Sequence, residues 1–346
     1  MSKRVAIVIL NWNGKHFLER FLPILIARTP EDYAQIVVAD NGSTDGSSAF
    51  LTAHFPQLQQ LVFERNFGYT GGYNRALAQI DADYYILLNS DVEVTPGWLP
   101  PLVEAMETHP QMGVCMPKVH AWTHPNKFEY AGACGGYIDR FGFPFCRGRI
   151  ITHIEDDEGQ YDKPVPVFWA SGTCLMVRSA LFRRLGGLDE AFFAHMEEID
   201  FCWRVQWSGW QVWVVPQSVI LHVGGGTLPN NSPQKLFYNY RNNLYMMYKN
   251  LTNRELLFVL PMRLLIDDLS MVAYLIQGKG SFSWAVIRAH WAFYRTRKRL
   301  TRIPAKGVRI PPEGVYRASI ILRFFLSFRK LRFSDLSKVL FHATTW

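Results

Sequence analysis

The sequence predicts an α/β fold in which a mostly parallel sheet is covered by helices. Four short apolar segments have the length and the turn-bounded ends of buried strands: residues 5–10, 35–39, 60–64 and 84–88. Segments with helical periodicity lie between them, at residues 15–28, 47–54 and 72–79. Strands and helices that alternate through short connections are typical of a parallel sheet with helices on both faces.

The composition is that of a globular protein. The chain has 346 residues, of which 49% are hydrophobic and 19% are charged, so it can bury a sizeable core and is too apolar to be disordered. Its five cysteines show no metal-ligand spacing, and we expect reduced thiols in a cytosolic compartment. The apolar run at residues 5–10 is too short for a signal peptide. Since no stretch of 18 apolar residues lacks charges, we also expect no transmembrane helix.

The charge is unevenly distributed along the chain. Residues 1–240 hold 18 Lys and Arg against 24 Asp and Glu, whereas residues 241–346 hold 19 against 5. A basic segment can bind nucleic acid or an anionic membrane. Aromatic and aliphatic residues interrupt the basic ones, as at residues 324–330, which favours a membrane. We therefore predict that residues 251–346 form a helical, basic region that associates with a membrane surface and does not bind nucleic acid.

Unusual polar residues follow the first two predicted strands, where ligands bind in parallel sheets. Asn11, Trp12 and Asn13 follow the first strand, and Asp40 follows the second. An Asp at this position can accept hydrogen bonds from a nucleotide base or a ribose hydroxyl. Taken alone, this segment is better explained by a turn that caps the next helix.

The third and fourth strands end in further candidate binding segments. Residues 65–74 form a glycine-rich loop with Asn66, Gly71 and Asn74, in which the backbone can approach a ligand closely. Asn89, Asp91 and Glu93 follow the fourth strand at alternate positions, and an extended chain would place them on one side. Oxygen ligands there suit Mg²⁺ or Mn²⁺ carrying a diphosphate, although a solvated turn is the simpler alternative.

Two features of the second half also indicate a site. Glu197, Glu198 and Asp200 lie together at the start of a predicted helix at residues 197–208. The helix dipole alone favours carboxylates there, but a crowded carboxylate can also have a raised pKa and act as a base. His222 follows a strand predicted at residues 211–215 and precedes three glycines, an arrangement that favours an open site. We read residues 120–164 as an irregular insertion that flanks this site.

Six segments, taken together and in this order, identify a family resemblance. They are ILNWNG, VVADNGSTDGS, NFGYTGGYN, LLNSDVEV, ASGTCLMVRSALFRRLGGLDEAFFAHMEEIDFCWR and VPQSVILHVGGG. The chain resembles the family 2 glycosyltransferases of the GT-A fold, and most of all their bacterial rhamnosyltransferase-like branch. The resemblance covers roughly residues 4–250. It implies a glycosyltransferase domain over residues 1–250, with a nucleotide-sugar half (about 1–118) and an acceptor half (about 119–250).

The family implies an inverting, metal-dependent transfer of a sugar from a nucleotide-diphosphate sugar to an acceptor hydroxyl. In this branch the transferred sugar would be rhamnose. The acceptor would be a lipid-linked or saccharide intermediate of bacterial cell-surface polysaccharide synthesis, and the reaction would take place at the cytoplasmic face of the membrane. By position, the resemblance assigns nucleotide-sugar binding to Asn11, Trp12, Asn13, Asp40, Asn66, Gly71, Asn74 and Asn89.

The same resemblance assigns the reacting groups. Asp91 and His222 would bind Mg²⁺ or Mn²⁺ on the diphosphate. Glu198 stands where the family has its catalytic base, which is Asp in most relatives, so Glu197 stays an alternative. The acceptor side would include Trp169, Asp189 and Glu190.

Three other functions fit parts of the sequence. A dinucleotide-binding oxidoreductase would need G-x-G-x-x-G after the first strand, where residues 11–14 read NWNG. A sugar nucleotidyltransferase would also use a metal on a sugar nucleotide. A non-enzymatic nucleic-acid-binding protein could use the basic region.

Overall fold

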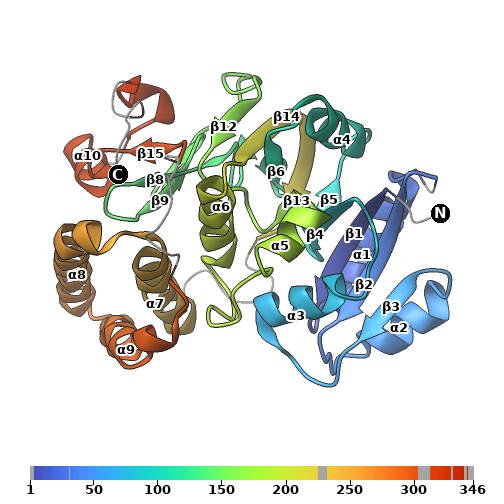
Figure 1. Cartoon of the computed structure of the whole chain (residues 1–346), viewed down its shortest axis with the longest axis horizontal. Helices are drawn as coiled ribbons and strands as arrows, with labels where there is room; N and C mark the ends of the chain where they lie inside the picture. Colours follow the sequence, from blue (N-terminus) through green and yellow to red (C-terminus); the bar gives the residue numbers. More distant parts are fainter. Residues whose placement is uncertain are drawn as a thin grey trace.

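The computed structural model describes residues 4–30, 32–224, 232–302, 312–328, 330–338 and 341. Its centre is a mixed sheet whose first half has the predicted parallel strands (Figure 1). These are β1 (Val5–Asn11), β2 (Ala34–Asp40), β3 (Gln59–Val62) and β4 (Tyr84–Asn89), in the spatial order β4-β1-β2-β3. The strands β1 and β4 are continuous apolar runs because the sheet is covered on both faces there, and Val5 to Val8 are fully buried. The edge strand β3 is polar at Gln59 and Gln60 and partly exposed.

The second half of the sheet adds strands of both directions. The strand β13 (Cys174–Arg178) runs antiparallel between β4 and β6 (Met112–Ala121). The long strand β14 (Gln211–His222) is parallel to β6, and the short strands β5 (Val92–Val94) and β12 (Val165–Val167) pair with it antiparallel. The pairing of β14 with β5 puts His222 opposite Val92, which places His222 near Asp91.

The helices of the first half lie where the sequence places them. They are α1 (Lys15–Ala27), α2 (Ser47–His54) and α3 (Gly68–Leu77), followed by α4 (Leu99–Thr108), α5 (Ser179–Arg184) and α6 (Glu197–Trp207). The helix α3 begins four residues before its predicted start. Gly68 has a φ of 73°, and a Cβ there would collide with Phe193, so only glycine fits at this helix start.

Two sequence-based expectations are wrong. The strand predicted at residues 211–215 continues to His222, because a bulge between Val215 and Val219 carries it past Pro216. The stretch 120–164 is not irregular. It holds strands too short to show a period: β7 (His124–Phe128), β8 (Gly136–Asp139), β9 (Pro144–Cys146), β10 (Arg149–Ile150) and β11 (His153–Ile154). The last four form a second small sheet, which β15 (Val315–Tyr316) joins.

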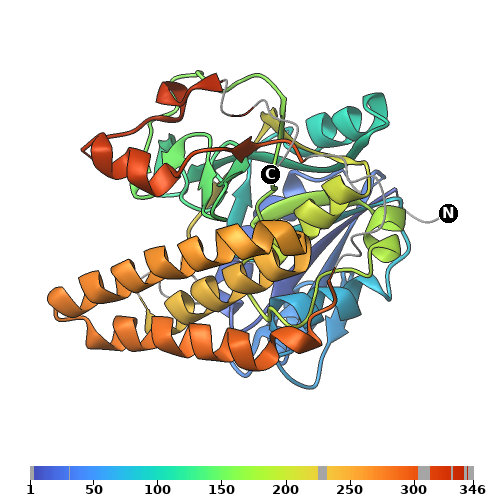
Figure 2. The ribbon, with the colours of Figure 1, turned by 60° about the vertical axis from the view of Figure 1, so that its left-hand side comes forward.

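The C-terminal part is mainly helical, as predicted. It consists of α7 (Pro233–Asn250), α8 (Asn253–Ile276), α9 (Gly280–Thr296) and α10 (Ile320–Leu326). Figure 2 shows α7, α8 and α9 side by side, and each of the three contacts the other two. Within the described residues, no helix is long and apolar enough to cross a membrane. All five cysteines are buried and free. The proposed division of the chain at residue 250 stays a prediction.

A buried ion cluster fastens α6 to α7. Asp200 on α6 is fully buried and accepts hydrogen bonds from Lys249 Nζ (2.8 Å), Asn250 Nδ2 (2.8 Å) and Arg204 Nε (2.9 Å). Burial opposes the ionised form of Asp200, but Lys249 and Arg204 outweigh it and hold the pKa below its usual value. Both helices therefore depend on this cluster for their relative position.

We predict that Lys249→Met destabilises the fold strongly. The substitution leaves Asp200 buried with one cation fewer, and breaking a buried pair in this way costs about 3 kcal/mol. Urea unfolding of the full chain measures this loss. The matched control is Lys15→Met, since Lys15 pairs with Glu19 (3.6 Å) at the surface and should cost less than about 1 kcal/mol. Equal losses in the two variants would contradict the role assigned to the cluster.

Candidate active site

A cavity of about 490 Å³ lies at the carboxyl ends of β1, β4 and β14. This is the edge of the sheet at which the sequence predicts ligand binding. The structure brings the following predicted site residues together in its lining: Trp12, Asn66, Asn89, Asp91, Trp169, Glu197, Glu198 and His222. Residues far apart in the sequence, from loops, strand ends and a helix start, thus converge on one space.

Asn11 and Asp40 lie directly behind this lining. They end β1 and β2 in matching register, and both are buried. Ser43 links them, because its hydroxyl accepts a bond from Asn11 Nδ2 (3.2 Å) and its backbone N–H donates to Asp40 Oδ1 (2.7 Å). Asn11 Oδ1 and Asp40 Oδ2 have no hydrogen-bond donor among the described residues. Buried acceptors without a donor are rare and indicate a missing ligand or water.

The other predicted binding residues support the site from outside the cavity lining. Asn13 Oδ1 accepts a bond from the Thr44 N–H (2.8 Å) and joins the first two loops. The Asn74 amide exchanges two hydrogen bonds with the Leu188 backbone (2.7 and 3.0 Å) and fixes the segment before α6. Gly71 permits close packing, because a Cβ there would lie 2.9 Å from Arg75 Nη1.

The two carboxylates expected on the acceptor side do not line the cavity. Asp189 pairs with Lys249 (2.5 Å), and Glu190 pairs with Arg75 (3.0 Å). Both therefore tie the loop before α6 to neighbouring helices. Their ion pairs explain their presence without any contact to an acceptor.

The acidic segment after β4 does not run straight, so its carboxylates separate. The chain turns at Ser90 and Asp91 before β5 begins. Asp91 faces the cavity, whereas Glu93 binds Arg28 (3.1 Å) and the indole N–H of Trp122 (3.0 Å) outside the lining. The expectation that Asn89, Asp91 and Glu93 share one side is wrong for Glu93.

His222 lies between two carboxylates of the cavity wall. Its Nε2 is 3.2 Å from Asp91 Oδ1, and its Nδ1 is 3.3 Å from Glu129 Oε2. Burial disfavours the charged imidazole, but the two carboxylates outweigh it and raise the pKa of His222 to about 10. Sequence reasoning missed Glu129, which follows β7 in the stretch taken as irregular and has no motif around it.

The Asp91 and His222 pair suits a divalent cation that takes the place of the proton on His222 Nε2. A carboxylate oxygen and an imidazole nitrogen 3.2 Å apart can share one ion, and Glu129 would hold the far side of the imidazole ring, as second-shell carboxylates do. In the described part of the chain no three His, Cys, Asp or Glu side chains form a metal cluster. Two protein ligands leave the remaining positions to phosphate oxygens and water, which is how Mg²⁺ usually binds.

Glu197 and Glu198 begin α6 and differ in their exposure. Glu197 is only 4% exposed, whereas Glu198 is partly exposed to the cavity. Burial, and then the neighbouring Glu198, raise the pKa of Glu197 well above its usual value. Burial also raises the pKa of Glu198, to about 7. Burial therefore raises the pKa of both carboxyls, and the pKa of Glu198 lies where a carboxyl gains or loses a proton near neutral pH.

The loop before these carboxylates is held in a strained conformation. Phe193, His195 and Met196 have φ values of 67°, 71° and 70°, which residues with a Cβ rarely adopt. The Asn242 side chain on α7 donates to the carbonyls of Ala194 (2.8 Å) and His195 (2.7 Å). Sequence reasoning missed Asn242, because an isolated Asn within a helix carries no signal of such a role.

Basic and aromatic side chains complete the cavity. Lys235 lies in the first turn of α7, where burial lowers its pKa although Glu129 and Asp91 oppose that shift. Burial and Lys235 together lower the pKa of His195 to about 4, so its imidazole is neutral. The aromatic lining residues are Trp12, Tyr69, Tyr130, Trp169, Phe193 and Tyr238.

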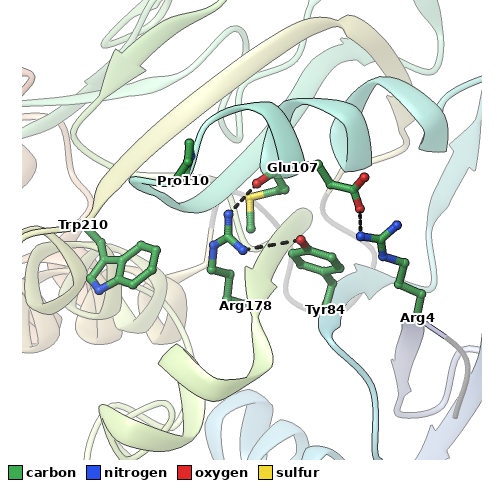
Figure 3. A pocket seen from close by; sticks show the side chains of 7 residues that line it. Arg4, Tyr84, Glu107, Pro110, Arg178 and Trp210 are labelled. Atoms are coloured by element: carbon green, nitrogen blue, oxygen red, sulfur yellow. Dashed lines mark hydrogen bonds and ion pairs between the residues drawn. The ribbon is translucent and has the colours of Figure 1, made fainter.

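A second hollow of about 300 Å³ lies at the opposite ends of β1 and β4 (Figure 3). Its arginines are engaged by the protein itself. Arg178 donates to the Met112 carbonyl (2.9 Å) and to the Tyr84 hydroxyl (3.4 Å), and Arg4 pairs with Glu107. The larger cavity, with its paired carboxyls, is therefore the candidate active site.

Comparison with known proteins identifies relatives of this chain. Residues 6–186 match the family described as Glycosyl transferase family 2. An N-acetylglucosaminyl-diphospho-decaprenol L-rhamnosyltransferase of Mycobacterium tuberculosis is 30% identical over 236 residues, which are 64% of this chain and 76% of that protein. The O-antigen biosynthesis protein RfbC of Myxococcus xanthus is 26% identical over 229 residues, covering 64% of this chain and 17% of that protein.

Solved structures show the same fold at low identity. GalNAc-T7 with UDP, GalNAc and Mn²⁺ has a TM-score of 0.56 and 18% identity, over 72% of this chain and 48% of that one. The mannosyltransferase PcManGT of Pyrobaculum calidifontis, in complex with GDP-Man and Mn²⁺, has a TM-score of 0.52 and 13% identity, over 85% and 88%. Both likenesses confirm a GT-A-type α/β fold.

We predict that Glu197→Gln makes the protein more stable relative to the natural chain as the pH rises. A carboxyl whose pKa is higher in the folded state than its unfolded value of about 4.3 destabilises the fold once the pH passes that unfolded value. Gln carries no proton to lose, so the gain should grow as the pH rises above that unfolded value. Thermal unfolding of both chains over a series of pH values measures it. The control Glu64→Gln removes an exposed carboxyl and should show no such trend; a pH-independent effect of Glu197→Gln would contradict the assignment.

Proposed function

The chain belongs to glycosyltransferase family 2, and on this premise we propose that it is a metal-dependent, inverting transferase. It would move a sugar from a nucleotide-diphosphate sugar to an acceptor hydroxyl. The observation that carries this proposal is the placement of a proton-accepting carboxyl and a cation-binding pair in one cavity. Direct displacement by the acceptor needs one base at the hydroxyl and positive charge at the leaving diphosphate.

Glu198 is the proposed base. Its side chain reaches the cavity, and its pKa of about 7 lies near the pH at which a general base is most effective. The acceptor hydroxyl gives its proton to Glu198 as its oxygen attacks the anomeric carbon. Glu197 is buried, which raises its pKa well above its usual value and leaves little of its side chain open to an acceptor. The choice of Glu198 over Glu197 thus rests on exposure and on pKa, in agreement with the position of the base in the family.

Asp91 and His222 would hold Mg²⁺ or Mn²⁺ at the other reacting group. The ion would neutralise charge on the departing nucleoside diphosphate, and Glu129 would orient the imidazole ring. Two solved structures of this fold hold Mn²⁺ as well as a nucleotide or nucleotide sugar, which supports a divalent ion without choosing between the two metals. Lys235, in the first turn of α7, adds positive charge to the same wall.

The loops after β1 and β2 would bind the nucleoside. Asn11 Oδ1 and Asp40 Oδ2 are buried acceptors that base N–H and ribose O–H groups could satisfy. Trp12 is 39% exposed at the cavity and offers a face on which a base can stack.

We further propose a rhamnosyl donor and a lipid-linked acceptor in bacterial polysaccharide synthesis. The support is the Mycobacterium tuberculosis relative, whose name states an L-rhamnosyl transfer to a decaprenol-linked diphosphate sugar. Trp169 and the other aromatic residues of the lining suit the apolar faces of sugar rings. An enzyme with such an acceptor works at the cytoplasmic surface of the membrane, and the basic C-terminal region is consistent with that place.

We predict that Glu198→Gln lowers the turnover rate by about a hundredfold or more while donor binding is nearly unchanged. The amide keeps the size of the side chain but cannot take the proton. Calorimetry with the nucleotide sugar and initial rates of nucleoside-diphosphate release separate the two effects. Glu197→Gln is the matched control and should retain most of the rate. A normal rate in Glu198→Gln together with an inactive Glu197→Gln would move the base by one residue.

We also predict that Asp91→Ala and His222→Ala weaken binding of a nucleoside diphosphate in the presence of Mn²⁺ much more than in its absence. Each substitution removes one proposed ligand of the ion, and Asp91→Ala should abolish transfer. Glu93→Ala is the matched control, because Glu93 is a neighbouring carboxylate engaged outside the cavity. Equal losses with and without Mn²⁺ would show that both residues are structural.

A further inference from the structure

The outer face of α8 is apolar, although it faces solvent. Along nearly the whole helix its exposed large side chains repeat at helical spacing: Leu257, Phe258, Met262, Leu265, Leu269, Val272, Leu275 and Ile276. Leu269 is 63% exposed. Asp268 is the exposed carboxylate among them, and it lies 3.7 Å from His290 Nδ1 of α9. A contiguous apolar face of this length is rare on a soluble surface and indicates a binding partner.

The apolar outer face of α8 is not a core-facing side turned outward, because the inner side of the helix makes its own buried contacts. Arg263 and Asp267 are buried there and form an ion pair (2.9 Å). Arg263 also donates to Asn243 Oδ1 of α7 (2.5 Å), and Asp267 meets His290 of α9 (3.4 Å). The three helices are therefore fixed to one another by satisfied polar contacts, and the apolar side of α8 is left facing outward.

The outer face of α9 carries aromatic and basic side chains together. Trp284, Trp291 and Tyr294 are exposed, and Trp291 is 62% exposed. Arg295 lies over the Trp291 ring (4.9 Å), and Arg288 is exposed on the same face. Indole rings beside arginines are the composition found at the level of lipid headgroups.

We propose that the outer faces of α8 and α9 dock on an anionic lipid bilayer, lying in its headgroup region. The apolar side chains of α8 enter the acyl boundary, and the arginines of α9 meet lipid phosphates. The assignment deepens the proposed function by naming the surface that brings the enzyme to a membrane-held acceptor.

Charge favours a bilayer over a second copy of the chain. A twofold self-association places the same patch on both partners, so Arg288 and Arg295 would face their own copies. Asp268 is the exposed acidic side chain of α8 and α9 that could pair with these arginines, and it lies next to His290. Burying cations without acidic partners is costly, whereas anionic lipids supply the opposite charge.

The same helices connect this surface to the cavity. Ala285 and Ala289 of α9 pack on Phe237 of α7, one residue before Tyr238, which lines the cavity with Lys235. Figure 2 shows α9 running along α7. Docking through α8 and α9 therefore holds the α7 wall of the cavity at a fixed place relative to the membrane.

Sedimentation of the full chain with vesicles tests the proposal. Vesicles of phosphatidylcholine with phosphatidylglycerol should bind the protein, and vesicles of phosphatidylcholine alone should bind it at least about tenfold more weakly. The double variant Leu265→Glu/Leu269→Glu and the variant Trp291→Glu should each lose about tenfold or more of the binding to the anionic vesicles. Val62→Glu, at a position 60% exposed on β3, is the matched control and should bind normally. Thermal unfolding confirms that each variant is folded.

Three results would overturn the proposal. One is a failure of the natural chain to bind anionic vesicles. Another is release by Leu326→Glu on α10 while the α8 and α9 variants still bind. The third is a dimer in the natural chain that the α8 variants convert to a monomer without any change in vesicle binding, since this would assign the face to a second copy. None of these measurements depends on turnover, so their outcome is separate from that of the Glu198 test.

Discussion

The position of the proposed base depends on how α7 holds the start of α6. Lys249 and Asn250, near the end of α7, bind the buried carboxylate of Asp200. Earlier on the same helix, the side chain of Asn242 donates hydrogen bonds to the carbonyls of the strained loop that precedes Glu197. Without these contacts the φ values of this loop would relax, because left-handed conformations of residues with a Cβ persist only where their surroundings impose them. The helix that anchors the base also begins at the opposite wall of the cavity with Lys235.

Three carboxyls at the start of α6 show how surroundings divide structural from chemical roles. Asp200 is surrounded by Lys249, Arg204 and Asn250, and its pKa is held low, so it stays charged and holds the fold. Glu197 is buried and Glu198 is partly buried, and one oxygen of each has no hydrogen-bond partner among the described residues, so burial raises the pKa of both. One acidic motif thus supplies a permanent ion-pair anchor and a carboxyl that exchanges a proton near neutral pH.

Much of the fold could be predicted from local pattern. The first four strands and their helices are long enough to show their periods, and the polar segments after them do gather at one edge of the sheet. The residues that were missed depend on distant parts of the chain. Glu129 reaches His222 from a stretch of two- to five-residue strands, and Asn242 reaches the loop before α6 from the middle of a helix. The alternation of side chains predicts that Glu93 lies on the side of Asp91 only if the chain is extended, and the chain turns at Ser90. The three glycines after Val223 fall only partly within the described residues, of which Gly224 lines the cavity.

The proposed function depends on one reaction. An acceptor hydroxyl displaces a nucleoside diphosphate from an anomeric carbon, with a carboxyl as base and cationic groups at the phosphates. The most direct measurement is identification of the products from a thymidine-diphosphate sugar and a lipid-linked saccharide in the presence of Mn²⁺. For a single displacement we expect nucleoside diphosphate in the phosphorus NMR spectrum and a glycoside whose anomeric configuration is opposite to that of the donor. Release of pyrophosphate would instead indicate a nucleotidyltransferase, and a glycoside that keeps the donor's configuration would contradict displacement assisted by a single base.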